Sequence, residues 1–406
     1  MSDTPKRPDG ELSPRTGPEN ADAAPTDAAP TDAAPTAPHA APPITEAEER
    51  YYLASQWQLM WRKFKRHRLA IIGSIVLGIL YLLAIFSEFL APYDPYTRHP
   101  DYAYAPPQRI RIFHEGRLTR PFVYGWTTEF DDYRFVDVFV PNTEERYPIR
   151  LFLRGDDYRM WGLFRTDLHF FGVQEGVMFL FGTEELGRDL LSKTIYAARV
   201  SLSVGLVGVA LSFILGCILG GLSGYFGGAT DTVIQRVIEF LLSIPTIPLW
   251  LALSAALPPE WGSVRIYFGI SIILSIVGWC SIARVVRGKL LEVREADFVM
   301  AARLGGLGSG EIIARHLLPS FLSYLIVSLT LAIPNMILAE TALSFLGLGI
   351  RPPALSWGVL LQEAQNVRTV YLNPWLLIPG IFVVVTVLAF NFLGDGLRDA
   401  ADPYKS

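Results

Sequence analysis

Few side chains in this sequence are placed where they could do chemistry. Glu340 is an ionisable group inside an otherwise apolar run, and such a group in a membrane segment is by default a functional hypothesis. His99, His114 and His169 are scattered and lack the spacing of metal ligands. No nucleophile–base arrangement is evident, and the chain has no Gly-x-x-x-x-Gly-Lys-Ser/Thr loop to hold ATP phosphates. The sequence therefore predicts no catalytic, cofactor or metal site of its own.

A polar loop is the most informative stretch of the chain. It is Val293–Ser320, and it lies between two hydrophobic runs that are each long enough to cross a bilayer. Glu295–Leu304 has the pattern of a short helix and is followed by a glycine-rich turn. Glu311–Leu318 has the pattern of a second helix, which Pro319 is expected to close. A helix–turn–helix across the mouth of a membrane bundle offers a surface that another protein can bind.

Composition places the chain among membrane proteins. Its 406 residues are 51% hydrophobic and its mean hydropathy is +0.31, which is rare in a soluble domain. The net charge of −4 and the lack of a basic patch argue against nucleic-acid binding. Cys217 and Cys280 both lie in apolar runs and are expected to be small buried residues. No early apolar segment with a cleavage site is present, so no removable signal peptide is expected.

The N-terminal part predicts a tail, an interfacial segment and a first span. Residues 1–45 are low in complexity, with three Asp-Ala-Ala-Pro copies, and should stay disordered. Residues 46–68 carry tryptophans one helical turn apart and then a basic cluster, which indicates a cytoplasmic amphipathic segment leading into the membrane. Residues 69–90 supply the roughly 20 apolar residues of a first transmembrane helix.

Residues 91–198 are predicted to form an insertion outside the membrane and a helix that leads back to it. The polar part, Tyr96–Leu180, alternates apolar and polar residues as half-buried strands do. Strands are expected at Phe122–Tyr124, Arg134–Val140 and Tyr147–Arg154, with turn signals at Pro141-Asn142 and Gly155–Asp157. Thr183 is expected to cap the leading helix, which should end near Arg199.

Residues 199–398 are predicted to hold five further spans. In the second span of the chain, small residues recur every four positions and indicate close helix packing. Pro245 and Pro248 interrupt the third span; such a break either lines a transport path or only kinks the helix. Lysine and arginine are in excess in the loops on one side of the predicted membrane, which is consistent with two cytoplasmic termini. Residues 399–406 would then form a cytoplasmic C-terminal tail. The predicted spans are Val200–Tyr225, a segment ending near Leu257, Ile266–Ile282, Phe321–Gly349 and Pro374–Phe392.

Four phrases together resemble the permease subunits of ABC importers, in the dipeptide and oligopeptide family and its C-type, microcin C-uptake-like branch. Residues 293–320 resemble the EAA loop of those subunits, although Met300 stands where the family usually has glutamate. The alanine, glycine and Leu-Pro places of the loop pattern are filled by Ala301, Ala302, Gly306, Leu318 and Pro319. The other three phrases are Phe181–Ser192, Glu340–Gly349 and Leu393–Asp399.

The resemblance implies an all-α polytopic membrane protein with six transmembrane helices, the type I ABC importer permease fold, and here a strand-rich periplasmic insertion. It implies a subunit that forms half of a peptide translocation path in the bacterial inner membrane, with both termini cytoplasmic. The partners implied are a second permease subunit, two cytoplasmic ATPase subunits or domains and a periplasmic peptide-binding protein. ATP and Mg²⁺ would bind only to the ATPases, whose movement would reach this chain through Ala301, Ala302, Gly306, Leu318 and Pro319.

Several interpretations stay open at this level. Glu340 and Pro245 are candidates for the translocation path, but Glu340 could instead pair with a neighbouring helix. The same fold could import another solute such as nickel, or the chain could be a membrane receptor or scaffold that transports nothing. A membrane enzyme is disfavoured, because no paired constellation accompanies Glu340. Neither the role of the insertion nor the peptide preference can be predicted from the sequence.

Overall fold

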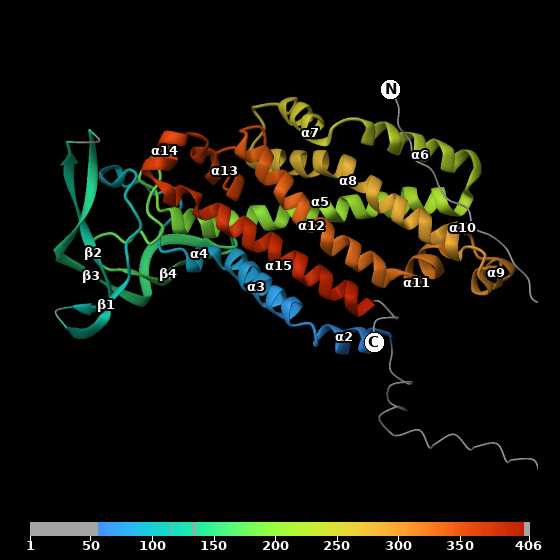
Figure 1. The fold of residues 1–406 in the computed structure, drawn as a ribbon, viewed down its shortest axis with the longest axis horizontal. Helices are drawn as coiled ribbons and strands as arrows, with labels where there is room; N and C mark the ends of the chain where they lie inside the picture. Colours follow the sequence, from blue (N-terminus) through green and yellow to red (C-terminus); the bar gives the residue numbers. More distant parts are fainter. Residues whose placement is uncertain (1–55, 115, 133–134, 402–406) are drawn as a thin grey trace, which may run out of the picture. The chain divides into compact units, whose positions relative to one another are not determined.

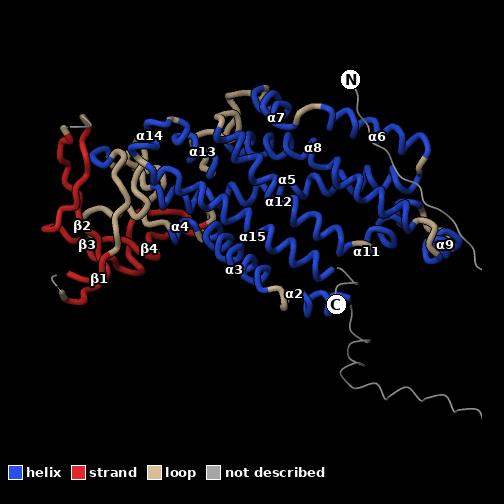
Figure 2. Tube along the Cα trace, viewed as in Figure 1, coloured by secondary structure: helices blue, strands red, loops and turns tan. Residues whose placement is uncertain are grey.

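The computed structural model describes residues 56–114, 116–132 and 135–401. The predicted tail of residues 1–45, the first part of the segment 46–68 and residues 402–406 lie outside these described residues. Along the described chain helices dominate, and a single antiparallel sheet is inserted between α4 and α5 (Figures 1 and 2).

Five helical segments of the described chain are long and apolar enough to cross a membrane, and a bent pair would make a sixth. The segments are α3 (Arg68–Ile85), α5 (Leu190–Phe226), α8 (Ser263–Val293), α12 (Leu322–Phe345) and Pro374–Ala401, which joins η4 (Pro374–Leu377) to α15 (Ile378–Ala401). The bent pair is α6 (Gly228–Ser243) and α7 (Thr246–Ala255). The described chain is thus mostly helical, with five to six candidate spans where the sequence predicted six, and it carries the predicted strand-rich insertion.

The bent pair corresponds to the interrupted third span. Its two helices differ in direction by 86°. Ile244 has an extended backbone, with ψ 131, because the ring of Pro245 disfavours the helical conformation in the residue before it. Pro248 lies in the first turn of α7, where a helix has no use for the N–H group that proline lacks. Pro245 is therefore the residue that breaks the helix.

The predicted leading helix and second span are one continuous helix, α5. Its N-cap is Asp189, whose Oδ2 accepts from the Ser192 N–H at 2.8 Å. The prediction that Thr183 caps this helix was wrong. The Thr183 hydroxyl oxygen instead accepts from the Ala105 N–H at 2.8 Å, so it fixes the chain that leads out of the first span.

Helix α5 packs closely along α8, and the small residues predicted to permit this lie at the contact. A Cβ added at Gly220 would lie 2.5 Å from the Ala283 carbonyl oxygen, too near for any side chain. The close approach extends the van der Waals contact between two helices for which lipid provides no hydrophobic drive. The predicted packing face of α5 is confirmed.

The inserted sheet has four antiparallel strands in the order β1-β2-β3-β4. Two of the four strands, β1 and β4, were not predicted. The predicted turns at Pro141-Asn142 and Gly155–Asp157 were also wrong, because β3 runs through both. Register shifts fall beside these residues, so the extra residues are accommodated as bulges. The strands are β1 (Arg111–His114), β2 (Arg117–Asp131), β3 (Val136–Met160) and β4 (Phe164–Val173).

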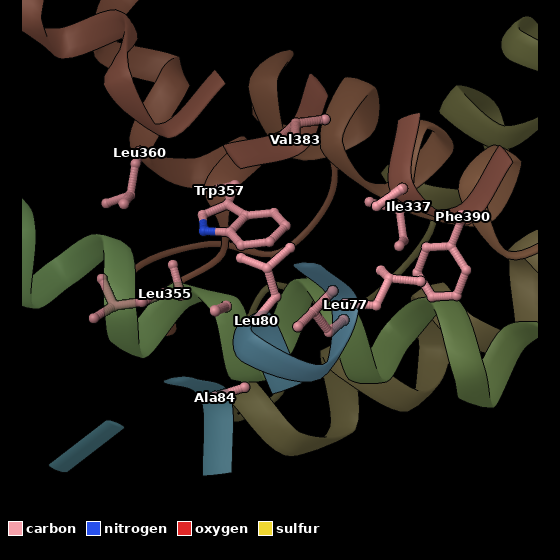
Figure 3. Close-up of a cluster of buried hydrophobic side chains, with 13 residues drawn as sticks. Leu77, Leu80, Ala84, Ile337, Leu355, Trp357, Leu360, Val383 and Phe390 are labelled. Carbon is pink, nitrogen blue, oxygen red and sulfur yellow. The ribbon is translucent and has the colours of Figure 1, made fainter. Parts of the chain in front are cut away.

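Buried apolar clusters hold the long helices together. In one of them, Trp357 is fully buried among side chains of α3, α5, α12 and α15 (Figure 3). Its Nε1 donates to the Thr194 carbonyl of α5 at 3.1 Å. At the other end of α15, Met60 and Phe64 of α2 pack near Ala400. The remaining short elements are α2 (Gln56–Phe64), α4 (Ser87–Leu90), η1 (Pro100–Tyr102), α13 (Trp357–Leu361), η3 (Gln362–Gln365) and α14 (Val367–Leu372).

Candidate functional site

The polar loop between α8 and α12 is a helix–turn–helix. Its first helix is α9 (Asp297–Leu304), and the second runs without a break through α10 (Ser309–Ile312), η2 (Ile313–Leu317) and α11 (Leu318–Ser320). Pro319 does not close this helix, contrary to the prediction. The turn before it is a π-helix, in which the Leu318 N–H donates to the Ile313 carbonyl. The wider turn makes room for the proline ring, and the helix ends at Phe321 instead.

Gly306 ends the first helix of the loop in a Schellman motif. Its N–H donates to the Arg303 carbonyl at 3.0 Å, and the Leu307 N–H donates to the Ala302 carbonyl at 3.2 Å. The φ of Gly306 is +80°, the left-handed region that favours glycine. No atom lies within 4 Å of where its Cβ would be. The need for glycine at this position is therefore conformational and not steric.

Of the two alanines of the loop, Ala302 is buried and Ala301 is exposed. Ala302 is 8% exposed and lies in an apolar cluster with Val299, Ile312 and residues of α8 and α12. Ala301, the residue before it in α9, is exposed. Near it, Leu304 is 85% exposed. One face of the loop thus holds it to the bundle, while the other presents apolar groups to the surroundings. Further large apolar side chains exposed on α9 are Phe298 and Met300.

Charged contacts tie the loop region to the neighbouring helices. The Arg287 guanidinium of α8 binds Asp231 of α6 through two contacts, Nε–Oδ1 at 2.5 Å and NH2–Oδ2 at 2.6 Å. The Arg303 guanidinium carbon of α9 lies 5.1 Å from the centroid of the Tyr225 ring, near the end of α5. A displacement of α9 would therefore act directly on α5 and on α8, against which α9 packs, and reach α6 only through α8.

A cavity of about 340 Å³ lies between α5, α7, α8 and α12, with Leu242 of α6 at its edge. Its wall is mostly apolar, but Ser212 Oγ and Trp250 Nε1 are buried there without a hydrogen-bond partner in the described structure. Buried polar groups are normally satisfied, so a solute with its own polar groups would bind here favourably. The other polar side chains of the wall are Thr246, Ser281, Ser328 and Asn335.

The two residues predicted for a path do not line this cavity. Pro245 is exposed at the bend before α7, next to Thr246 in the cavity wall. Glu340 of α12 is 0% exposed, and its Oε1 accepts from the Ser344 hydroxyl at 2.7 Å. The Ser201 hydroxyl of α5 lies 3.5 Å from its other oxygen. Glu340 therefore joins α12 to α5 in the interior.

A buried ionic cluster at the start of α5 was not predicted from the sequence. The Glu184 carboxylate is 1% exposed and accepts from Arg188 at 2.6 and 2.8 Å and from Lys193 Nζ at 2.8 Å. Burial disfavours its charged form, but the Arg188 hydrogen bonds and the Lys193 charge outweigh this and lower the pKa of Glu184. Burial and the neighbouring Glu184 raise the pKa of Glu363 to about 8. The only sequence sign was the four-residue spacing of Glu184 and Arg188.

Replacing Glu184 by glutamine should lower the melting temperature of the detergent-solubilised protein. The substitution leaves the Lys193 and Arg188 charges in a buried site, and breaking such a pair costs about 3–5 kcal/mol.

The matched control is Glu363→Gln. Its carboxyl is protonated in the folded protein up to about pH 8 but ionises near 4.5 in the unfolded chain. The contribution of the Glu363 carboxyl group to the free energy of unfolding therefore falls as the pH rises from about 4.5 to 8.

Glutamine at 363 cannot ionise, so this variant should match the original chain at the acid end of that range. It should then become progressively more stable than the original chain as the pH rises to 8. Equal destabilisation by the two substitutions would contradict the assignment of charge within the cluster.

Comparison with known proteins matches most of the chain. Residues 173–405 match the family described as binding-protein-dependent transport system inner membrane component. Residues 55–107 match the N-terminal TM domain of oligopeptide transport permease C. Residues 108–172, which hold nearly the whole sheet, lie between these two matched regions. The sheet is therefore an insertion relative to both.

The curated relatives include permease proteins of dipeptide and oligopeptide transport systems. The dipeptide transport system permease protein of Alkalihalophilus pseudofirmus is 31% identical over 90% of this chain and 94% of its own length. The dipeptide permease of Bacillus subtilis is 40% identical over 55% of this chain and 68% of its own length. The oligopeptide permease of Haemophilus influenzae is 41% identical over 57% and 72%. A methionine ABC transporter in an inward-facing conformation aligns with a TM-score of 0.40 at 19% identity, over 52% of this chain and 97% of that structure.

Proposed function

Because the chain belongs to the family of binding-protein-dependent transport system inner membrane components, we propose that it is the permease subunit of an ATP-driven peptide importer. A relative named as a dipeptide permease aligns with 90% of the chain, which favours peptides over other solutes. The chain is a transporter subunit and not an enzyme. In the type I ABC importer permease fold that the family implies, α6 and α7 together would be the third of six spans.

The arrangement of the loop is the observation that carries this proposal. Its buried face packs on α8 and on the start of α12, and both helices also line the cavity. Its exposed face carries Ala301 and Leu304 and is free to bind a partner. A protein that moves this face moves the helices around the cavity. Gly306 and the π turn before Leu318 and Pro319 set the geometry of the loop, so these residues belong to the same coupling element.

The proposed partners follow from this division of labour. Two cytoplasmic ATPase subunits bind ATP and Mg²⁺ and press on the loop when they close. A second permease subunit supplies the other half of the path, and a periplasmic peptide-binding protein delivers the solute. The loop and both termini then lie in the cytoplasm, which agrees with the arginines of the loop, and the sheet lies in the periplasm.

The path is proposed to run along the cavity between α5, α7, α8 and α12. Pro245 shapes it by turning α7 away from the line of α6. Glu340 lies outside the cavity lining, where its contacts with Ser344 and Ser201 hold α12 against α5. The lining is uncharged, as suits a path for peptides that differ in side-chain charge.

Two experiments test the function. A mild-detergent pull-down of this chain from its native membrane should recover an ATPase with a phosphate-binding loop, a second permease and a peptide-binding protein. Deletion of the chain should abolish growth on defined di- and oligopeptides and leave growth under nickel limitation unchanged. Recovery of the chain alone, beside an intact control complex, would favour a receptor or scaffold. A defect limited to nickel would reassign the solute.

A further inference from the structure

The tip of the β3–β4 hairpin lies at the outer end of the first span. Its Trp161 Nε1 donates to the Ile85 carbonyl at 2.8 Å, and Ile85 is the last residue of α3. With 18 residues at 1.5 Å each, α3 is about 27 Å long, slightly less than the hydrocarbon thickness of about 30 Å. A residue that is hydrogen-bonded to the last carbonyl of α3, as Trp161 is, therefore lies at the edge of the hydrocarbon layer and not in bulk water.

The hairpin tip, residues 160–164, is apolar and exposed. Trp161 is 47% exposed, Leu163 76% and Phe164 63%. Trp161, Gly162 and Leu163 form its three-residue loop, because Met160 pairs with Phe164. Trp161 and Gly162 both have positive φ, 53° and 73°, as the two central positions of a type I′ turn require. A bulky side chain is uncommon at the first of these positions, where asparagine or glycine is preferred. The chain thus presents a tryptophan at the point of the hairpin nearest the membrane.

The tip continues the outward apolar face of α3. Ile75, Ile79 and Leu82 of that helix are 52–58% exposed, as side chains facing lipid are. Between α3–α4 and the hairpin lies a groove of about 530 Å³ with an almost wholly apolar lining. The groove is apolar, which suits an acyl chain and not a polar peptide. Its walls include Leu82, Phe86, Phe89, Leu90, Met160 and Leu168.

Two arginines flank the tip. Arg159 and Arg165 are directly opposite each other across β3 and β4, and both are exposed. Arg165 binds Asp157 at 2.7 Å. The residues nearest the tip, 157–165, therefore carry two arginines and one aspartate, while Asp167 beyond them lies 3.8 Å from Arg154. Opposed like charges destabilise a sheet in water, and a phosphate between or beside them relieves the repulsion. The order of groups is apolar tip and then basic flank, which is the order of groups in a lipid from acyl chain to headgroup.

We propose that the β3–β4 hairpin tip is a membrane anchor that inserts into the outer leaflet of the bilayer. Trp161, Leu163 and Phe164 enter the acyl region, an acyl chain occupies the groove beside α3, and Arg159 and Arg165 meet lipid phosphates. Aromatic side chains at this depth are favourable because the interface suits amphipathic rings. The insertion would then hold the sheet against the membrane in a fixed orientation. This inference rests on α3 crossing the membrane and is independent of the solute transported.

Depth-dependent quenching tests the anchor in the whole complex reconstituted into liposomes. Single cysteines at Leu163→Cys and, separately, Phe164→Cys carry a fluorophore sensitive to polarity. The matched control is Leu118→Cys, an equally exposed leucine (72%) on the β1–β2 hairpin. The unsubstituted chain gives the labelling background, since Cys217 and Cys280 are buried. Nitroxide lipids labelled near the headgroup should quench positions 163 and 164 at least about threefold more than position 118, and iodide should do the reverse.

Each other outcome overturns the anchor. Equal iodide quenching at 163, 164 and 118 would place the tip in water. Protection of 163 and 164 from both quenchers would place it against protein, for example a helix of the second permease. Peptide uptake by the labelled complexes, measured in parallel, separates failure of this inference from failure of the import proposal.

Discussion

Replacing Gly306 by valine should lower peptide uptake at least about tenfold, while the same substitution at Gly308 should leave uptake close to that of the original chain. Both glycines are exposed in the turn between α9 and α10, and at both a Cβ would meet no atom within 4 Å. They differ in backbone conformation. The φ of Gly306 is +80°, whereas that of Gly308 is −68° with ψ 151°, which any residue adopts.

The expected loss follows from the Schellman motif at the end of α9. A side chain in the left-handed region costs about 1–2 kcal/mol, and a β-branched one costs more. To escape this strain, valine at 306 must give up the hydrogen bonds to the Arg303 and Ala302 carbonyls, which set the angle between the two helices of the loop. The surface that we propose binds the ATPase then changes shape. Since about 1.4 kcal/mol corresponds to a factor of ten, uptake should fall at least about tenfold.

Asparagine provides the internal control, because it tolerates the left-handed region better than other side chains do. Gly306→Asn should therefore keep most of the uptake that Gly306→Val loses. Uptake of a labelled peptide in a strain lacking the native chain measures all three variants, and immunoblotting of membranes checks their abundance. The idea fails if valine at 306 transports normally, or if valine at 308 is equally damaging.

The sequence predicted the membrane part of the fold because lipid imposes a simple rule. Each span requires a long apolar run, and each bend requires a local cause such as Pro245. The small-residue face of α5 was equally readable, since four-residue spacing fixes a helix face. The turn signals in the insertion misled, because Gly155–Asp157 can relieve a strand as a bulge as well as end it. Which of the two occurs depends on the pairing of β3 with β4.

Whether a site residue could be predicted also depends on whether its environment is set by the local chain or by distant parts of the chain. Gly306 could be singled out because it fills the glycine place of the resembled loop pattern, and the turn it forms depends only on the local backbone. The cluster around Glu184 could not, because Glu363 is far away in the sequence and reaches it only through the fold. The burial of Ala302 and the exposure of Ala301 follow from how α9 packs on α8 and α12, and no spacing within the loop determines that. The cavity lining is likewise drawn from four separate helices.

Glutamate in place of either of the two adjacent alanines, Ala301 or Ala302, should abolish peptide uptake, but for different reasons. Glutamate at Ala301 places a charge on the exposed face of α9, where the ATPase is proposed to bind. The chain should fold normally, keep its melting temperature and lose the ATPase in a pull-down. Glutamate at Ala302, which is 8% exposed in an apolar cluster, buries an unpaired carboxyl group at a cost of several kcal/mol. That variant should lose thermal stability before it loses any partner.

Met300→Glu is the matched control for Ala301→Glu. It adds the same side chain one residue away, at a position that is 48% exposed and where the family pattern usually has glutamate. If the effect at Ala301 came from negative charge on α9 in general, Met300→Glu would also release the ATPase. We expect it to retain both ATPase and uptake, because the resembled loop pattern has glutamate at this place and a small side chain at 301. Release of the ATPase by both variants would mean that the contact is electrostatic, whereas retention by both would place the ATPase elsewhere on the chain.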